Sequence, residues 1–278
     1  MKQGDFAFLA EMLRRRAGLS LGQTRPQVVE SRLAPVMRRF GFRDCATLIA
    51  ELRHGREALA RAVTEAMTTN ESCFFRDRAV FDQFRDIVLP SIVARRAATR
   101  RLRIWSAACA AGQEAYSIAM IVDERKLRSQ GWTVDIIATD LSSDMIARAE
   151  KGLYSDFEAQ RGLPARRLIE HFTQEGSNWR IRESIRRMIA FRHFNLLDSY
   201  GWLDEVDVVF CRNVLIYFDH RTKTNVLGRI ADILAPGGYL MLGPAETSLG
   251  LEEDFVGLEG APGVFVKGRR VLPRALAS

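Results

Sequence analysis

The segment LRIWSAACAAGQEAYSIAMIVDERKL, residues 102–127, decides the fold. Its start, 102–106, has the character of a short buried strand, and residues 113–127 place apolar side chains at helical spacing. The same alternation of strand and helix returns along the chain, which predicts an α/β domain built on an open, mostly parallel, doubly wound sheet. The further predicted elements are strands at 133–139, 207–211, 239–242 and 263–267 and helices at 143–151 and 221–234.

The rest of the chain is organised around this domain. Apolar side chains recur at helical spacing through the first 69 residues, which predicts a small bundle of about four helices. Between 155 and 192 the alternation stops, and short stretches at 179–182 and 188–193 predict an inserted antiparallel β-subdomain. The predicted parts are a helical domain at 1–69, a linker at 70–90, an α/β domain at 91–268 that carries the insertion, and a tail at 269–278.

The composition is that of an ordinary globular protein. Hydrophobic residues make up 47% of the 278 residues and charged residues 27%, which excludes a disordered or collagen-like chain. No charge-free apolar run approaches the roughly 18 residues of a membrane span, and the N-terminus lacks a signal-peptide core, so we expect a cytoplasmic protein. The four cysteines and four histidines show no paired or ligand spacing, which argues against a disulfide framework or a metal site.

Positive charge is concentrated near the N-terminus. The net charge is +7, and residues 1–76 carry 13 basic and 8 acidic side chains. Such an asymmetry favours an acidic partner surface, for which nucleic acid, anionic lipid and an acidic protein all qualify. A solvated face in a chain rich in arginine explains the charge equally well.

Polar side chains follow three of the predicted strands, at the edge where doubly wound sheets bind ligands. Glu114 begins a helix after a loop of small residues, which would let the backbone approach a ligand closely. Asp140 ends the second strand, where it could accept hydrogen bonds from a ribose or cap the next helix. Arg212 and Asn213 follow the strand at 207–211, and their polarity favours a site over a core position.

Five stretches together resemble one known family. They are MTTNESCFFR (67–76), WSAACAAGQEAYSIA (105–119), ATDLS (138–142), FNLL (194–197) and FCRNVLIYF (210–218). Their order and spacing are similar to those of the CheR family of chemotaxis receptor methyltransferases over nearly the whole chain. The resemblance implies a helical N-terminal domain, a linker, and a Rossmann-like S-adenosylmethionine-dependent methyltransferase domain with a small inserted antiparallel β-subdomain.

The resemblance also implies an activity and partners. The implied enzyme transfers a methyl group from S-adenosylmethionine to glutamate side chains of chemoreceptors, giving glutamyl methyl esters and S-adenosylhomocysteine. Its partner would be the cytoplasmic helical bundle of a chemoreceptor, whose methylation helices are acidic, and it would be recruited from the cytoplasm to membrane receptor arrays. No nucleic acid, no metal and no stable membrane insertion are expected.

Carried over residue by residue, the family pattern implies a site. Glu114 would hold the methionine ammonium, Asp140 the ribose hydroxyls, and Asn195 with Leu196 the adenine. The implied cofactor set is Asn70, Ser72, Arg76, Glu114, Asp140, Asn195, Leu196, Arg212 and Asn213. Arg76 and Tyr217 are the catalytic candidates, since either could orient the acceptor carboxylate or shape the methyl channel, although Arg76 could equally serve the cofactor alone. The implied receptor-docking arginines are Arg32, Arg38, Arg39 and Arg43.

Some positions depart from the family pattern. Ser72 stands where threonine is common, and Gln113 and Ala115 replace the usual glutamate and proline, but none of these changes removes an expected functional group. The loop within 172–179 is short and lacks the glycine-containing extension of peptide-binding members, which predicts the type that does not need a receptor pentapeptide. The alternatives are a methyltransferase for a different signalling protein and a non-catalytic S-adenosylmethionine-binding adaptor. A nucleic-acid binder is disfavoured, because aromatic residues are not interleaved with the N-terminal arginines.

Overall fold

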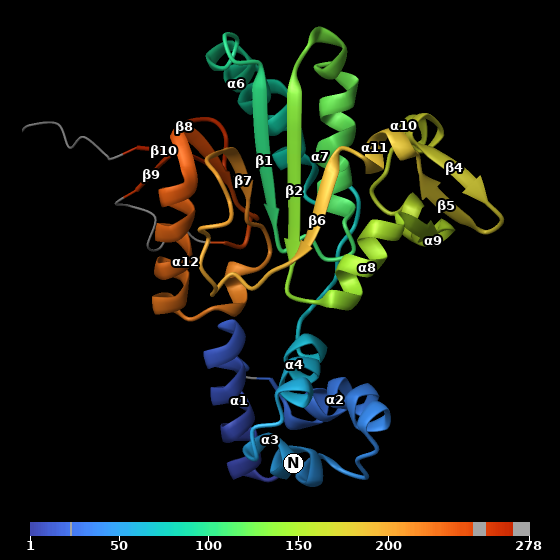
Figure 1. Ribbon diagram of the computed structural model, residues 1–278, viewed down its shortest axis with the longest axis vertical. Coiled ribbons are helices and arrows are strands. Elements are labelled where there is room, and N and C mark those ends of the chain that lie inside the picture. The colour runs from blue at the N-terminus through green and yellow to red at the C-terminus, as the bar shows by residue number, and fades with distance from the viewer. Residues whose placement is uncertain (23, 247–253, 269–278) are drawn as a thin grey trace, which may run out of the picture.

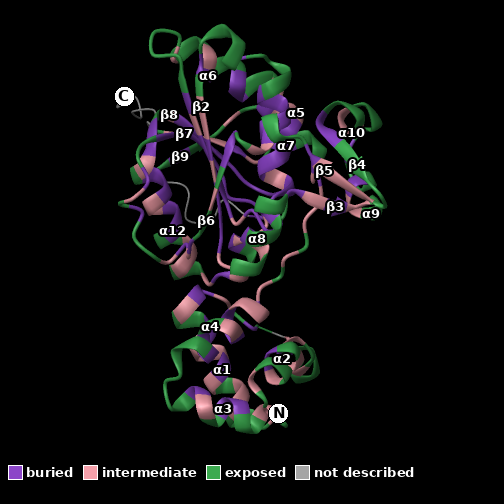
Figure 2. Cartoon of the chain, turned by 45° about the vertical axis from the view of Figure 1, so that its right-hand side comes forward, coloured by how far each residue is buried: buried purple, intermediate pink, exposed green. Residues whose placement is uncertain are grey.

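The computed structural model describes residues 1–22, 24–246 and 254–268. A helical domain and a larger α/β domain lie end to end, with a small β-subdomain on one side of the latter (Figure 1). Figure 2 shows that the strands at the centre of the α/β domain are mostly buried, whereas the helices are exposed on their outer sides. No helix among the described residues has the length and apolar character needed to cross a membrane.

The N-terminal domain is a four-helix bundle, as predicted. Its helices are α1 (Gln3–Ala17), α2 (Pro26–Phe40), α3 (Cys45–Arg53) and α4 (Glu57–Ala66). The first two end, as expected, at Gly18 and Gly41, which adopt the left-handed conformation that favours glycine. The core is made of aliphatic side chains, among them Leu9, Leu13, Val29, Leu33, Leu48, Ile49, Leu59 and Val63.

The α/β domain contains a seven-stranded sheet with the order β6-β2-β1-β7-β8-β10-β9. The first five of these strands are parallel, which confirms the predicted mostly parallel sheet. At one edge β10 pairs antiparallel with β8, and β9 pairs antiparallel with β10. The strands are β1 (Arg101–Ala107), β2 (Thr133–Asp140), β6 (Ile189–His193), β7 (Val206–Phe210), β8 (Leu234–Met241), β9 (Phe255–Gly257) and β10 (Val264–Lys267).

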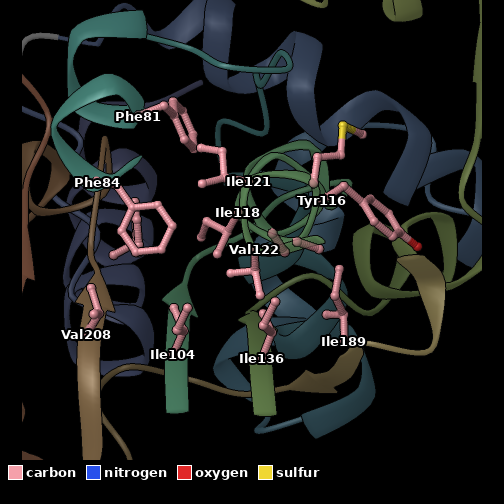
Figure 3. Packing of buried hydrophobic residues seen from close by; sticks show 14 of the residues in the cluster. Phe81, Phe84, Ile104, Tyr116, Ile118, Ile121, Val122, Ile136, Ile189 and Val208 are labelled. Atoms are coloured by element: carbon pink, nitrogen blue, oxygen red, sulfur yellow. The ribbon is translucent and has the colours of Figure 1, made fainter. Parts of the chain in front are cut away.

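Helices cover both faces of this sheet. On one face, Ile104, Ile136 and Val208 of the three central strands pack against Phe84 and Ile118 (Figure 3). Two helical segments cover that face. The first runs without a break through α5 (Arg78–Gln83), the π-helical turn η1 (Phe84–Val88) and α6 (Leu89–Arg95), and the second is α7 (Gln113–Glu124). The opposite face packs against α12 (His220–Ile233), while α8 (Ser143–Lys151) follows β2. Burial on both faces explains why β1, β2 and β7 contain consecutive apolar residues, such as 104–105, 136–137 and 208–210.

The predicted antiparallel β-subdomain exists, but its predicted extent was wrong. Its sheet has the order β3-β5-β4, whereas the stretch 188–193 forms β6, which pairs in parallel with β2 at the edge of the main sheet. This stretch alternates because an edge strand has one covered and one exposed face: Phe191 packs on Tyr116 of α7, and its neighbours are exposed. The subdomain comprises β3 (Leu153–Ser155), α9 (Asp156–Gln160), α10 (Ala165–His171), β4 (Phe172–Glu175) and β5 (Asn178–Ile181), and α11 (Glu183–Arg186) follows.

Two smaller differences lie at the antiparallel edge. The strand predicted at 239–242 begins earlier, because β8 also contains residues 234–238. The register of β8 with β7 shifts between Val206 and Val208. A proline and two glycines interrupt the regular ladder there. The strand at 255–257 was not predicted, because it is only three residues long.

Gly162 of the β-subdomain packs against Phe74 of the linker. Its replacement is expected to destabilise the protein. It adopts a φ of +86°, and a Cβ atom there would overlap the carbonyl oxygen of Phe74. We expect Gly162→Ala to lower the free energy of unfolding by at least about 2 kcal/mol, measured by urea denaturation. Gly176, with a φ of +61° and open space where a Cβ atom would lie, is the control, and Gly176→Ala should cost about 1 kcal/mol. Equal losses would contradict the role of the Phe74 contact.

An ion pair ties α7 to the same subdomain and makes stability depend on pH. Arg167 donates two hydrogen bonds, of 2.6 and 2.8 Å, to Glu124, and the imidazole of His171 lies 3.7 Å from the same carboxylate. Burial alone would raise the pKa of Glu124, but the nearby imidazole of His171 and the hydrogen bonds from Arg167 outweigh it and lower the pKa to about 2. The charged form therefore favours the folded state above about pH 4.5, and this contribution is lost as the pH falls toward 2.

Glu124→Gln tests this dependence. At pH 7 we expect the variant to be about 1–2 kcal/mol less stable than the parent, less than the full pKa difference implies because the pair is partly solvated. The difference should shrink as urea denaturation is repeated at pH values between 4.5 and 3. The exposed Glu259 provides the control. The free energy of unfolding of Glu259→Gln should differ little from that of the parent at every pH. A deficit for Glu124→Gln that stays constant with pH would rule out the ion pair as its cause.

Candidate functional site

A cavity lies at the carboxyl ends of the parallel strands, between the two domains. Figure 1 shows β1 and β2 pointing toward the helical bundle, and the loops that follow β1, β2, β6 and β7 line the cavity together with the linker and the end of α1. The space between its walls, with the open mouth included, is about 890 Å³. The structure brings together here every predicted cofactor and catalytic residue: Asn70, Ser72, Arg76, Glu114, Asp140, Asn195, Leu196, Arg212, Asn213 and Tyr217.

A buried ion pair forms one wall. Glu114, in the first turn of α7, accepts hydrogen bonds from Ser106 (2.8 Å) and from Nη1 of Arg212 (2.9 Å). Nη2 of Arg212 donates to the carbonyl of Arg76 and to the carboxylate of Asp77, both at 2.8 Å. Only 1% of the Arg212 side chain is exposed, so this one guanidinium holds the linker to the end of β7.

The buried ion pair still has unused hydrogen-bonding capacity. Burial raises the pKa of Glu114 above its usual value, although Arg212 and Ser106 act in the opposite direction. Nε of Arg212 is buried and has no hydrogen-bond partner among the described residues. A carboxylate that lines a cavity and is short of counter-charge is suited to a ligand that carries a positive charge.

Asp140 forms a second acidic wall. Its two carboxylate oxygens accept hydrogen bonds of 2.8 Å from the N–H groups of Ala110 and Ser142. The alternative in which Asp140 caps the next helix is wrong, because the side chain of Ser142 caps α8 by accepting from Met145. Burial raises the pKa of Asp140, and the two backbone bonds counteract part of that rise. Each oxygen keeps lone pairs free, so the carboxylate can accept two further bonds from ligand hydroxyls.

The small-residue loop after β1 lies close to the same cavity. The N–H groups of Ala108 and Cys109 both donate to the carbonyl of Thr139, at 2.8 Å, which turns the loop over the end of β2. Ala108 and Ala110 have positive φ angles of 75° and 48°, a strained conformation that is common at functional sites. Because their side chains are short, the loop leaves room for a ligand beside Asp140.

The helical domain contributes to the cavity directly. The side-chain amide of Asn195 donates to the carbonyl of Arg16 at 2.6 Å, at the end of α1. The N–H of Ser20 donates to the carbonyl of Tyr217 at 2.9 Å, and Leu19 pairs with Phe218 in an isolated β-bridge. The segment after α1 is therefore part of the wall next to Tyr217.

The predicted docking arginines do not line the cavity, and the surroundings of Arg32 differ from those of the other three. Arg32 donates to the carbonyl of Met67 (2.9 Å) and to the hydroxyl of Thr69 (3.0 Å), so its guanidinium is bound to the linker. Arg38, Arg39 and Arg43 are exposed. The guanidinium groups of Arg39 and Arg56 lie 5.6 and 5.3 Å from the centre of the Phe40 ring. Arg56, which the sequence did not single out, is therefore close to this exposed group.

One buried acid near the site was missed. Glu246 follows β8, and its carboxylate binds backbone N–H groups of the loop after β7. The rule that pointed to the polar residues after β1, β2 and β7 would have found Glu246 if applied to the end of β8. No cluster of three potential metal ligands occurs among the described residues.

In comparisons with known proteins, both domains match models of the same family. Residues 4–68 match the model of the CheR methyltransferase all-alpha domain, and residues 70–263 match that of the CheR methyltransferase SAM binding domain. The chain is 39% identical to chemotaxis protein methyltransferase 1 of Pseudomonas aeruginosa over 95% of this chain and 98% of that protein. It is 37% identical to a chemotaxis protein methyltransferase of Vibrio parahaemolyticus over 95% of this chain and 96% of that protein.

Proposed function

Because the chain belongs to the CheR methyltransferase family, a family of S-adenosylmethionine-dependent enzymes, we propose that it methylates glutamate side chains on the cytoplasmic helices of chemoreceptors. The products are glutamyl methyl esters and S-adenosylhomocysteine. The observation that carries the proposal is the cavity at the strand ends, which all ten predicted cofactor and catalytic residues line. The protein acts in the cytoplasm and reaches membrane receptor arrays through its substrate.

The walls of the cavity fit the cofactor chemically. The buried carboxylate of Glu114, with its raised pKa, receives the methionine ammonium, and the free lone pairs of Asp140 receive the ribose hydroxyls. The loop of Asn195 and Leu196 borders the adenine, with the Asn195 amide anchored on Arg16. Asn70, Ser72 and Arg76 close the site from the linker, and Arg212 holds the linker in place.

Catalysis requires little acid–base chemistry from the chain. The chemistry that S-adenosylmethionine supplies when bound is an electrophilic methyl group on a sulfonium. Because an acceptor glutamate has an ordinary pKa near ~4.3 and is ionised at neutral pH, no strong general base is needed. The residues of the chain instead position the two groups and exclude water. Tyr217, fixed through its carbonyl by Ser20, and Arg76 orient the acceptor carboxylate.

Transfer to a receptor fragment tests this function. The purified protein is incubated with S-adenosylmethionine labelled in its methyl group and with the cytoplasmic fragment of a chemoreceptor. We expect label on the fragment that alkali releases as methanol, because methyl esters hydrolyse in base and N-methyl groups do not. Alkali-stable label would overturn the ester assignment. Label on a different signalling protein would favour the methyltransferase with another substrate. Cofactor binding with no transfer to any acceptor would favour the non-catalytic adaptor.

The exposed arginines of the helical domain dock the acidic receptor helices by charge complementarity. We restrict the docking set to Arg38, Arg39 and Arg43, since the guanidinium of Arg32 is bound to the linker. Reversing all three to glutamate should reduce kcat/KM for the receptor fragment by about tenfold or more, with cofactor affinity unchanged. The matched control reverses Arg78, Arg128 and Arg166, which are exposed on the α/β domain. An equal loss in the control would show that only total charge matters.

Docking is proposed to be independent of a receptor pentapeptide. Strands β4 and β5 of the β-subdomain are joined by only Gly176 and Ser177, so there is no extended loop to cover a peptide added at the strand edge. Calorimetric titration with a receptor-tail peptide should therefore show no binding. A micromolar affinity would contradict the proposal.

A further inference from the structure

The turn after β8 places a buried carboxylate against the loop that carries Arg212 and Asn213. Glu246 is 8% exposed. Its Oε1 accepts hydrogen bonds from the N–H groups of Val214 (2.9 Å) and Leu215 (2.8 Å). Its Oε2 accepts from the N–H of Gly243 at 2.7 Å, and the Glu246 N–H donates back to the Gly243 carbonyl at 3.0 Å. One side chain therefore binds both the turn after β8 and the loop after β7.

We infer that Glu246 is a positioning residue, which holds the loop after β7 in the conformation that binds the cofactor. The inference rests on the proposed function, because it concerns the same site. Glu246 itself is not among the residues that line the cavity, so it acts through Arg212, Asn213 and Tyr217, which are. Hydrogen bonds from backbone N–H groups to a carboxylate are short and strong, which suits them to fixing a loop.

The loop needs such a partner because its conformation is unfavourable. Asn213 has a φ of 58°, in the left-handed region that side chains other than glycine rarely adopt. The next two N–H groups, those of Val214 and Leu215, donate to Glu246. Without the carboxylate, one half-buried and one buried donor would lose their partner, and the strained conformation would lose its support.

Gly243 shows how closely the turn and the loop fit. A Cβ atom at Gly243 would lie 2.9 Å from Nδ2 of Asn213 and 2.9 Å from Oε2 of Glu246. The side chain of Asn213 therefore lies on the same glycine that the carboxylate binds. A shift of Glu246 would be passed directly to Asn213, which lines the cavity.

The test compares two buried acids at opposite ends of β7. Asp207, at the start of the strand, is 2% exposed and accepts hydrogen bonds from Nε of Arg96 (2.7 Å) and the N–H of Arg103 (3.0 Å). Glu246→Gln and Asp207→Asn are isosteric changes that remove one buried charge each. Binding of S-adenosylhomocysteine is measured by calorimetry below the unfolding temperature of both variants, and kcat is measured at saturating cofactor.

We expect Glu246→Gln to weaken S-adenosylhomocysteine binding by about tenfold to a hundredfold and to lower kcat even at saturating cofactor, because Asn213 and Tyr217 are displaced. The amide resonances of Val214 and Leu215 should shift in the nuclear magnetic resonance spectrum. Asp207→Asn should lose stability but keep its affinity and kcat. If Glu246→Gln does not fold, Gly243→Ala, which crowds the same contacts, should show the same loss of binding.

The outcomes separate this inference from the proposed function. If the parent protein binds S-adenosylhomocysteine and Glu246→Gln binds it equally well with an unchanged kcat, the inference is wrong and the proposed function stands. Equal losses of affinity and kcat in Glu246→Gln and Asp207→Asn would also overturn it, because they would reflect general destabilisation. If the parent protein binds no S-adenosylhomocysteine, the proposed function fails first and the inference fails with it.

Discussion

Replacing Arg212 by methionine is expected to abolish measurable cofactor binding and to lower the free energy of unfolding by about 3–5 kcal/mol. Arg212 is the only described cation that hydrogen-bonds to the buried Glu114. Removing it leaves a carboxylate inside the protein without its counter-charge, and burial already raises the pKa of Glu114. The same substitution releases the carbonyl of Arg76 and the carboxylate of Asp77, so the linker would no longer be held against β7.

A double-mutant cycle separates the charge from the packing. Methionine keeps most of the side-chain volume over the Phe81 ring, which lies 5.3 Å from the guanidinium. Glu114→Gln combined with Arg212→Met removes both charges, and a buried pair removed together often costs little. We therefore expect the double variant to be more stable than Arg212→Met alone. Measured together with Glu114→Gln alone, the cycle should give a coupling energy of about 1–3 kcal/mol. Neither variant should bind the cofactor.

Urea denaturation and calorimetry check both expectations. Arg85, which is paired with Asp86 on the surface, supplies the control, since Arg85→Met removes an arginine of the same type from an exposed pair and should cost at most about 1 kcal/mol. Similar losses at Arg85 and Arg212 would show that the buried network contributes no more than a surface pair does.

Much of the site could be predicted because its chemistry lies in a few short segments. The resemblance to the CheR family is confirmed, and the polar residues at the ends of β1, β2 and β7 do meet at one edge of the sheet. They meet because parallel strands bring their carboxyl ends together, which is a property of the topology and not of any long-range detail. The position of Asp140 and Arg212 at this edge was thus predicted from local sequence alone.

The parts that were missed depend on tertiary contacts. Whether the alternating stretch at 188–193 joins the small sheet or the main one depends on which strand it pairs with, and its local pattern is the same in both cases. Arg32 belongs by spacing to an exposed face, but its length lets it reach Met67 and Thr69 of the linker. Glu246 contacts a loop 31 residues away in the chain. No periodicity reports such contacts.

Under the proposed function, the position of the cavity would link acceptor docking to cofactor binding. Residues after α1 form part of its wall, and Ser20 holds the carbonyl of Tyr217, while Asn195 is bonded to the end of the same helix. The domain proposed to dock the receptor therefore also completes the proposed cofactor site. A helical domain detached from the α/β domain would leave that site open on one side.

Asp140→Ala is expected to weaken the binding of S-adenosylmethionine and S-adenosylhomocysteine by about a hundredfold or more. The side chain is 6% exposed, and its carboxylate has two functions, which the substitution removes together. It accepts hydrogen bonds from the N–H groups of Ala110 and Ser142, which fixes the loop after β1. Its free lone pairs are proposed to accept hydrogen bonds from the ribose hydroxyls. Asp140→Asn keeps one carbonyl acceptor of the same shape, so we expect its loss of affinity to be smaller.

Comparing the two ligands by calorimetry locates the interaction. Both ligands contain the same ribose, whereas only S-adenosylmethionine carries a positive sulfur, so loss of a ribose contact should weaken both by the same factor. A loss confined to S-adenosylmethionine would instead mean that Asp140 acts on the charge of the sulfonium. Asp144, an exposed acid in the first turn of the adjacent helix α8, is the control, and Asp144→Ala should leave both affinities unchanged. Wild-type affinity in Asp140→Ala would remove the ribose assignment, and with it the strongest link between the end of β2 and the cofactor.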